Sequence, residues 1–307
     1  MKGNARLRLE TAADSNIGLV RTNNEDRFTI VEIPCDGQPG TLALVADGVG
    51  GHAAGEVASQ MVVGEVVRDL SAGACADPVR ELSRAVVRAG RAVYARSQEE
   101  EALRGMGTTL AAVWVIGSRL YTATVGDSRI YLHRRSKTIQ ASIDHTWVQE
   151  AVERGALTPQ QARIHPNAHV LRRHLGGPND PIPDQRLRLD GDEAADASAV
   201  HQGCALEDGD ALVLCSDGLS DLVNENEIER SLRHPRLDRS VKELIDLARN
   251  RGGHDNITVV AIRVPGKQAG RAGWHRFFPF ASWVLTILLL LGAAVAVYFL
   301  VIAHGAR

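Results

Sequence analysis

The feature that most constrains the fold is a series of short apolar runs, rich in β-branched residues, that alternate with longer segments of helical periodicity. Such runs, bounded by turn residues, predict strands. They lie at 41–46, 109–116, 120–125, 211–215 and 257–264. Only Gly117, Ser118 and Arg119 separate the second run from the third, which predicts an antiparallel hairpin.

Two helices are predicted between the first and second runs. Apolar residues recur at helical spacing, one set directly after Asp77-Pro78, a capping residue followed by a proline suited to the first helical turn. The two sets are Val57, Met61, Val62, Val66 and Leu70, and Val79, Leu82, Val86 and Val93. Each helix is expected to bury one face. The stretch 190–210 has no clear period and is expected to be a surface loop.

The C-terminal region differs sharply in composition from the rest. Residues 277–303 contain no charged side chain, and a single helix of this length spans a bilayer. Lys267, Arg271 and Arg276 precede this segment, whereas only Arg307 follows it, so the positive-inside rule places the preceding residues in the cytoplasm. We therefore expect a globular domain at 1–264, a linker at 265–276 and a single-pass C-terminal membrane anchor at 277–303.

Charge and cysteine usage exclude several classes. With 35 Lys and Arg against 37 Asp and Glu, the chain lacks the basic excess of a nucleic-acid-binding protein. Cys35, Cys75, Cys204 and Cys215 form no C-x-x-C pair and have no histidine at ligand spacing. We therefore expect neither a disulfide framework nor a zinc site, in keeping with a reducing cytosol.

Four aspartates adjoin the predicted strands. Asp47, Asp127 and Asp217 follow the ends of apolar runs, and Asp255 precedes the start of one. In an antiparallel sheet the start of one strand lies beside the end of its neighbour, so all four can share one rim. Mg²⁺ and Mn²⁺ prefer oxygen ligands. Converging carboxylates repel one another and need a positive charge, such as that of a cation, beside them. Taken alone, the Asp-Gly pairs at 47–48 and 217–218 are more typical of turns, and only the joint pattern of four acids favours a metal site.

Six strings occur in an order that resembles the bacterial branch of the metal-dependent protein phosphatases, the protein phosphatase 2C type. They are S-N-I-G-L-V-R-T-N-N-E-D at 15–26, D-G-V-G-G-H-A-A-G-E-V-A-S at 47–59, M-G-T-T-L at 106–110, V-G-D-S-R-I-Y at 125–131, C-S-D-G-L-S-D at 215–221 and D-N-I-T-V-V at 255–260. The resemblance implies an α+β fold, a four-layer α-β-β-α sandwich of two antiparallel sheets flanked by helices.

The resemblance also implies a site for two Mn²⁺ or Mg²⁺ ions and a third, weaker metal position. The implied metal-binding residues are Asp47, which bridges both ions, Gly48 through its carbonyl, Asp217, Asp255, Glu25 through metal-bound waters, and Asp127 with Asp217 at the third position. Asn256 is expected to position its neighbour rather than to bind metal. Arg21 would bind the phosphate, because its planar guanidinium matches two oxygens at once.

The implied activity is hydrolysis of phosphoserine and phosphothreonine on proteins by a hydroxide that bridges the two ions. The implied partners are phosphorylated proteins and a membrane serine/threonine kinase that the phosphatase opposes. Two alternatives stay open: a dedicated phosphatase of one regulatory protein, of the anti-anti-sigma-factor type, and a catalytically silent scaffold. Broad turnover of phosphopeptides would exclude the first, and phosphate release would exclude the second.

Two segments depart from or extend the family pattern. Val49 stands where many eukaryotic members carry a histidine proposed as general acid, which makes His52 a candidate for that role. Residues 144–166 correspond to the family's mobile flap, with Gly155 and Pro159 interrupting two short helices. The histidines at 165, 169 and 174 are expected to have structural roles, because no carboxylate or cysteine is expected to complete a zinc site.

Overall fold

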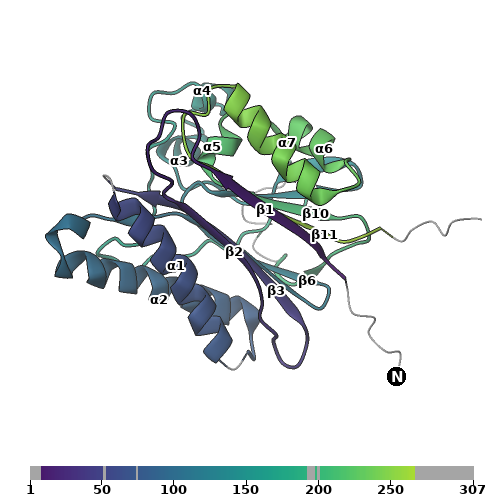
Figure 1. Cartoon of the computed structure of the whole chain (residues 1–307), viewed down its shortest axis with the longest axis horizontal. Helices are drawn as coiled ribbons and strands as arrows, with labels where there is room; N and C mark the ends of the chain where they lie inside the picture. The colour runs from purple at the N-terminus through teal and green to yellow at the C-terminus, as the bar shows by residue number, and fades with distance from the viewer. Residues whose placement is uncertain (1–7, 51–52, 74, 192–197, 199–200, 267–307) are drawn as a thin grey trace, which may run out of the picture. The chain divides into compact units, whose positions relative to one another are not determined.

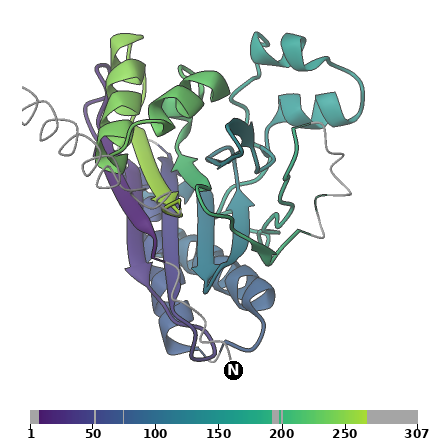
Figure 2. The same ribbon diagram turned by 90° about the vertical axis from the view of Figure 1, so that its right-hand side faces the viewer.

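The computed structural model describes residues 8–50, 53–73, 75–191, 198 and 201–266, all within one compact unit, Met1–Gly266. Its described strands form two sheets in which every pair of neighbours is antiparallel (Figures 1 and 2). One sheet has the order β1 (Glu10–Asn16), β11 (Ile257–Arg263), β10 (Ala211–Cys215), β7 (Arg129–Arg134) and β8 (Lys137–Gln140). The other has the order β2 (Asp26–Glu32), β3 (Gly40–Val49), β5 (Leu110–Ile116), β6 (Arg119–Val125) and β9 (Cys204–Ala205), with β4 (Gly107–Thr108) paired to β3.

The strand predictions are confirmed, including the hairpin between β5 and β6. Within 190–210, however, the described residues are not only loop, because β9 forms an edge strand against β6. Helices α1 (Ala53–Ala72) and α2 (Pro78–Glu99) match the two predicted helices. Asp77 caps α2 by accepting hydrogen bonds from the backbone N–H groups of Val79 and Arg80.

Three apolar cores separate four layers. Leu42 and Leu44 of β3 point to α1 and α2, whereas the alternating Ala43 and Val45 point to the second sheet. The outer face of that sheet packs on α6 (Glu225–Leu232) and α7 (Leu237–Asn250). Figure 1 shows α1 and α2 on one side of the strands and α6 and α7 on the other. The predicted α-β-β-α sandwich is therefore confirmed, and burial on both faces explains why β5 and β10 consist of apolar residues alone.

The remaining helices are short and lie in the connections. They are η1 (Glu101–Leu103), α3 (Trp147–Glu153), α4 (Pro159–Arg163) and α5 (Asp217–Ser220). Among the residues that the structure describes, no helix is long and apolar enough to span a bilayer. The linker at 265–276 beyond Gly266 and the anchor at 277–303 lie outside the described residues and stay predictions.

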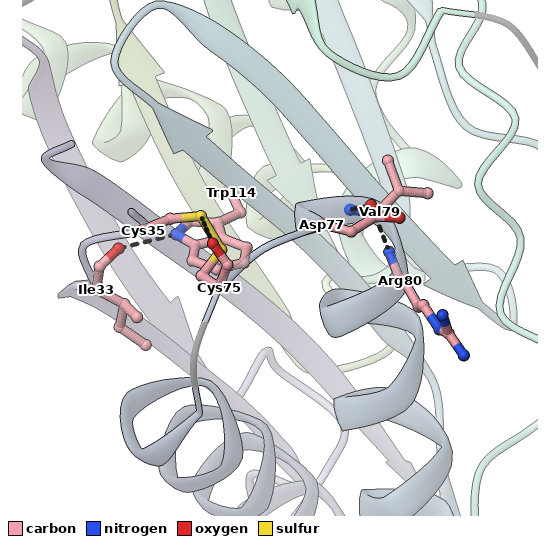
Figure 3. Close-up of a disulfide and its surroundings, with 7 residues drawn as sticks. All are labelled: Ile33, Cys35, Cys75, Asp77, Val79, Arg80 and Trp114. Atoms are coloured by element: carbon pink, nitrogen blue, oxygen red, sulfur yellow. Dashed lines mark hydrogen bonds between the residues drawn. A yellow bond between two sulfur atoms is a disulfide. The ribbon is translucent and has the colours of Figure 1, made fainter. Parts of the chain in front are cut away.

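The cysteine prediction is wrong for one pair. Cys35 and Cys75 form a disulfide across 40 residues (Figure 3). Cys35 lies in the β2–β3 turn, where Trp114 Nε1 donates to the Ile33 carbonyl at 3.0 Å, and Cys75 lies between α1 and α2. The two segments meet only because the helix pair packs on the sheet, so no local cysteine spacing could announce the bond. The other two cysteines, Cys204 and Cys215, are free.

Replacing both linked cysteines by alanine should destabilise the fold by about 2–4 kcal/mol, because the bond restricts the unfolded chain. The midpoint of urea unfolding measures this loss, with Cys204→Ala as the matched control. The disulfide lies beyond the end of β2 and β3 that is farthest from Asp26 and Asp47. Activity at low urea should therefore be unchanged. An unchanged midpoint would show that the bond contributes no stability.

Candidate functional site

Acidic side chains converge at one end of the sandwich. Asp47 lies near the end of β3 directly opposite Asp26 of β2, and Asp127 follows β6. Asp217 begins α5 just after β10, and Asp255 precedes β11. The four predicted aspartates are thus brought together, but they do not share the rim of one sheet. Two come from each sheet, and the packing of the sheets unites them.

The raised pKa values of the aspartates at this end of the sandwich indicate that the acidic cluster lacks a positive charge to offset it. Burial and the charges of Asp217, Asp26, Asp127 and Asp255 raise the pKa of Asp47 well above its usual range. The pKa of Asp127 is also raised well above its usual range, again first by burial and then by Asp217. Burial and neighbouring acids raise the pKa of Asp217 to about 6. Its buried Oδ1 has no hydrogen-bond partner among the described residues.

These groups fit hard divalent cations. The converging side chains offer carboxylate oxygens, which Mg²⁺ and Mn²⁺ prefer, and no cysteine lies among them. A partnerless buried carboxylate oxygen costs free energy unless it has a donor or a cation beside it. The residues present therefore match the donor chemistry of a Mg²⁺ or Mn²⁺ centre.

The M-G-T-T-L string holds Asp47 in place. The Thr109 hydroxyl accepts a hydrogen bond from the Asp47 backbone N–H at 3.0 Å, and the Thr108 hydroxyl donates to the Asp47 carbonyl at 2.8 Å. The Thr109 hydroxyl also lies 2.6 Å from that of Ser128, next to Asp127. Thr109 thus links the backbone of Asp47 to the side chain of Ser128, a role that we did not predict from the sequence.

Glycine allows a close approach between β3 and α1. A Cβ on Gly48 would lie 2.2 Å from the Gly55 carbonyl oxygen, and a Cβ on Gly55 would lie 2.1 Å from Glu25 Oε2. The Gly48 N–H donates to the Glu25 carbonyl at 3.2 Å. Gly55, for which we predicted no role, therefore lets the first turn of α1 sit against both Gly48 and Glu25.

Asn256 positions the loop that carries Arg21, whereas we expected it to position its neighbour Asp255. Its amide nitrogen donates to the carbonyls of Ile17 and Asn23 at 3.0 and 2.9 Å, and its Oδ1 accepts from the Glu25 N–H at 2.8 Å. The side chain of Arg21 is exposed, and its Nη2 lies 2.6 Å from Asp255 Oδ2. This hydrogen bond raises the pKa of Arg21, so the guanidinium stays charged beside the acids.

The sequence reading missed two acids of the cluster. Asp26 is only 2% exposed, accepts a 2.7 Å hydrogen bond from the Ser216 hydroxyl and thereby links β2 to the other sheet. Burial raises its pKa to about 7. Asp221, at the end of α5, also has a raised pKa, first through burial. Both stand in quoted strings, N-E-D and S-D-G-L-S-D, so their position next to predicted ligands was the available signal.

The histidines in and after the flap differ from the prediction in one case. His165 stacks on Trp147 at a ring distance of 4.9 Å, and His174 Nδ1 lies 3.1 Å from the Leu175 carbonyl, both structural roles. His169, however, places Nδ1 3.4 Å from Asp221 Oδ2. Ligand atoms of His169, Asp217 and Asp221 lie within 4.8 Å of one another, so carboxylates do accompany this imidazole. Pro159 begins α4 after its Thr158 cap. His52 lies outside the described residues.

A buried histidine, His145, connects the flap to the loop of Asp127. His145 Nδ1 accepts a hydrogen bond from the Gly126 N–H at 3.0 Å, and its Nε2 lies 3.2 Å from Asp184 Oδ2. The Gly126 carbonyl accepts from the His145 N–H at 2.9 Å. Thr146, the next residue, caps α3. The start of the flap and the Gly126-Asp127 turn are therefore one hydrogen-bonded unit.

Comparisons with known proteins agree with this architecture. The family model described as protein phosphatase 2C matches residues 20–258. The serine/threonine protein phosphatase PstP of Mycobacterium tuberculosis is 39% identical over 258 residues, which cover 84% of this chain and 45% of that protein. The chain thus spans about half the length of that relative. The serine/threonine phosphatase stp of Listeria monocytogenes is 34% identical over 259 residues, covering 83% of this chain and 95% of that protein.

A solved structure extends the similarity to three dimensions. The crystal structure of the catalytic domain of PstP in complex with two manganese ions has a TM-score of 0.67 and 37% identity, covering 84% of this chain and 98% of that one. The match to the family model, at residues 20–258, includes every acid of the cluster. The family expected from those strings is therefore confirmed: the chain belongs to the protein phosphatase 2C family.

Proposed function

We propose that the protein is a metal-dependent serine/threonine phosphatase that hydrolyses phosphate esters on proteins. The observation that carries the proposal is the convergence of Asp47, Asp127, Asp217 and Asp255, with Arg21 beside them, at one end of a protein phosphatase 2C fold. The names of the relatives, which are serine/threonine phosphatases, support this activity.

The metal centre would be held by the predicted residues. Asp47, Gly48, Asp217 and Asp255 would hold two ions, with Glu25 acting through water, and Asp127 would join Asp217 at a third position. The two manganese ions in PstP support this assignment. When bound, a pair of Mn²⁺ or Mg²⁺ ions would lower the pKa of water and offset negative charge on the phosphoryl oxygens.

The other residues act on the substrate or on its surroundings. Arg21 would bind two phosphate oxygens through its guanidinium, and Asn256 would keep the Arg21 loop against the start of β11. Thr109 would keep the Asp47 and Ser128 segments in register. The leaving hydroxyl needs a proton that the Val49 side chain cannot give, and His52 is the candidate donor on this chain.

Phosphate release from phosphoserine and phosphothreonine peptides by the whole chain in mild detergent tests the proposal. We expect turnover with Mn²⁺ and none with a chelator. A panel of peptides of unrelated sequence separates a general phosphatase from one dedicated to a single regulatory protein. Absence of turnover by folded, metal-loaded protein would favour the silent scaffold instead.

Replacing Arg21 by alanine should lower kcat/KM about 10- to 100-fold, because a charged hydrogen bond to phosphate is worth about 1.5–3 kcal/mol. Arg21→Lys should recover part of the loss, since lysine supplies charge without the planar fork. Steady-state kinetics on a phosphothreonine peptide measure both effects. Arg68→Ala, which removes an exposed arginine of α1, is the control. An unchanged KM and kcat in Arg21→Ala would exclude a phosphate-binding role.

We further propose that residues 277–303 anchor the domain to the membrane from the cytoplasmic side, next to a membrane serine/threonine kinase or its substrates. Tethering raises the local concentration of substrate without new contacts. The anchored chain should therefore dephosphorylate a membrane-bound substrate faster than a chain ending at 276, with equal turnover of a soluble peptide. Equal rates on both substrates would remove the rationale.

The disulfide provides a separate test of the side of the membrane. Disulfides are rare in a reducing cytosol, so a cytoplasmic domain should contain Cys35 and Cys75 as thiols in growing cells. Alkylation of intact cells followed by mass spectrometry distinguishes the two states. Alkylated Cys35 would support the cytoplasmic side, and a protected pair would contradict it.

A further inference from the structure

Exposed apolar side chains gather in two segments. Eight large hydrophobic residues are exposed among the described residues, and six of them belong to the β1–β2 loop or to the flap region. We name these the loop rim, Ile17, Leu19 and Val20, and the flap rim, Trp147, Ile164 and Val170. Scattered exposed apolar residues need no explanation, but their concentration in two segments is typical of a binding surface.

The loop rim adjoins the phosphate side of the candidate site. The Leu19 N–H donates to the Gly253 carbonyl at 2.8 Å, which places this loop on the turn before Asp255. Val20 directly precedes Arg21, whose guanidinium contacts Asp255. Leu19 is 60% exposed and Val20 63% exposed, so neither side chain is used by the core.

The flap rim adjoins the other side of the acidic cluster. Val170 follows His169, whose imidazole contacts Asp221, and the Val170 carbonyl accepts from the Trp147 N–H at 2.9 Å. His165 stacks on Trp147, and its neighbour Ile164 is 86% exposed. Figures 1 and 2 both place the β1–β2 loop and helices α3 and α4 at the same end of the sandwich.

We propose that the two rims bind apolar side chains that flank the phosphorylated residue, so that this enzyme selects phosphoserine and phosphothreonine segments with apolar neighbours. This inference rests on the proposed phosphatase function. A phosphorylated residue that reaches Arg21 and the acids must carry its neighbours over these loops. Two charged side chains beside the rims are already paired, Arg21 with Asp255 and Arg172 with Glu150. Apolar neighbours would therefore gain more from contact than charged ones.

Matched substrates test the selectivity of the whole chain with Mn²⁺. Two phosphothreonine peptides differ only in leucine or serine at the positions flanking the phosphothreonine, and para-nitrophenyl phosphate has no flanking residue. We expect kcat/KM to be at least about tenfold higher for the leucine peptide, mainly through KM. Equal kcat/KM for the two peptides would overturn the proposal.

Rim variants locate the selectivity. The double variants Leu19→Ser with Val20→Ser, and Ile164→Ser with Val170→Ser, should each reduce the preference for the leucine peptide at least threefold. Turnover of para-nitrophenyl phosphate should stay unchanged. Ile182→Ser is the matched control, since this exposed residue lies next to Pro181, which adjoins Gly90 of α2. A preference that survives in both rim variants would contradict the proposal.

The same assays separate failure of the proposal from failure of the proposed function. Turnover of the serine peptide and of para-nitrophenyl phosphate reports the phosphatase activity alone, whereas the ratio between peptides reports the rims. No turnover of any substrate would overturn both. Normal turnover without a leucine preference would overturn only the role of the rims.

Discussion

Asp217→Asn should lower kcat/KM by about 10³-fold or more while the protein stays folded. Asparagine has nearly the same shape but lacks the charge that a cation requires, and cation stabilisation of phosphoryl transfer is worth several kcal/mol. The buried Oδ1 of Asp217, like that of Asp26, has no hydrogen-bond partner among the described residues, so the substitution breaks no hydrogen bond at that oxygen. Phosphate release from a phosphothreonine peptide in Mn²⁺ measures the effect.

A second readout distinguishes loss of a ligand from misfolding. Asp217 is one of the acids whose charge raises the pKa of Asp47, so its neutralisation should relieve repulsion. In chelator at pH 8, the variant should therefore unfold at a higher temperature than the unsubstituted chain. Asp246→Asn, on the exposed face of α7, is the control and should change neither property. Activity within tenfold of the unsubstituted chain would contradict the assigned role.

In chelator, the protein should become less stable as pH rises. In Mn²⁺, it should become more stable as pH rises. Without cations, the carboxyls of Asp26 and Asp217 have pKa values of about 7 and about 6, above the value near 3.9 of an unfolded aspartate. These groups bind protons more tightly when the protein is folded. The stability that they contribute is thus fully present below about pH 4 and is lost as pH rises through about 6–7.

Thermal unfolding between pH 5 and pH 8, in chelator and in Mn²⁺, measures this reversal. At a hundredfold excess over Kd, each ion should add about 2.7 kcal/mol, or roughly 5–10 °C in Tm at pH 8. Asp26→Asn should flatten the pH dependence in chelator, because it removes one raised pKa. If chelator leaves Tm unchanged at pH 8, the acidic cluster does not hold metal.

Local sequence signals were sufficient for five strands and the two longest helices, but not for β1, β2, β7 and β8 or for α6 and α7. The β-branched runs that became β3, β5 and β10 are buried on both faces, so their composition alone marks them as strands. The start of α2 follows from Asp77-Pro78, a capping interaction among residues adjacent in sequence. The family strings added the sandwich and the identities of the acids, but their roles in metal binding stay predictions.

Contacts between distant segments escaped the sequence reading. Asp26 accepts a hydrogen bond from Ser216 across 190 residues, and His169 contacts Asp221 from the segment that follows the flap. The Cys35–Cys75 bond likewise joins segments that have no common motif. Each of these pairs depends on how a helix pair, a sheet or the flap packs, which is a property of the whole chain.

By itself, the sequence determined five of the strands, the two longest helices and the family, because periodicity, capping and short motifs depend on neighbouring residues. Only the tertiary structure decided that Asp47 and Asp127 come from one sheet and Asp217 and Asp255 from the other. It also decided that the loop rim and the flap rim lie at the same end. The physical reason is that burial of the apolar face between the two sheets sets their relative position, and this brings together charges that local patterns cannot relate.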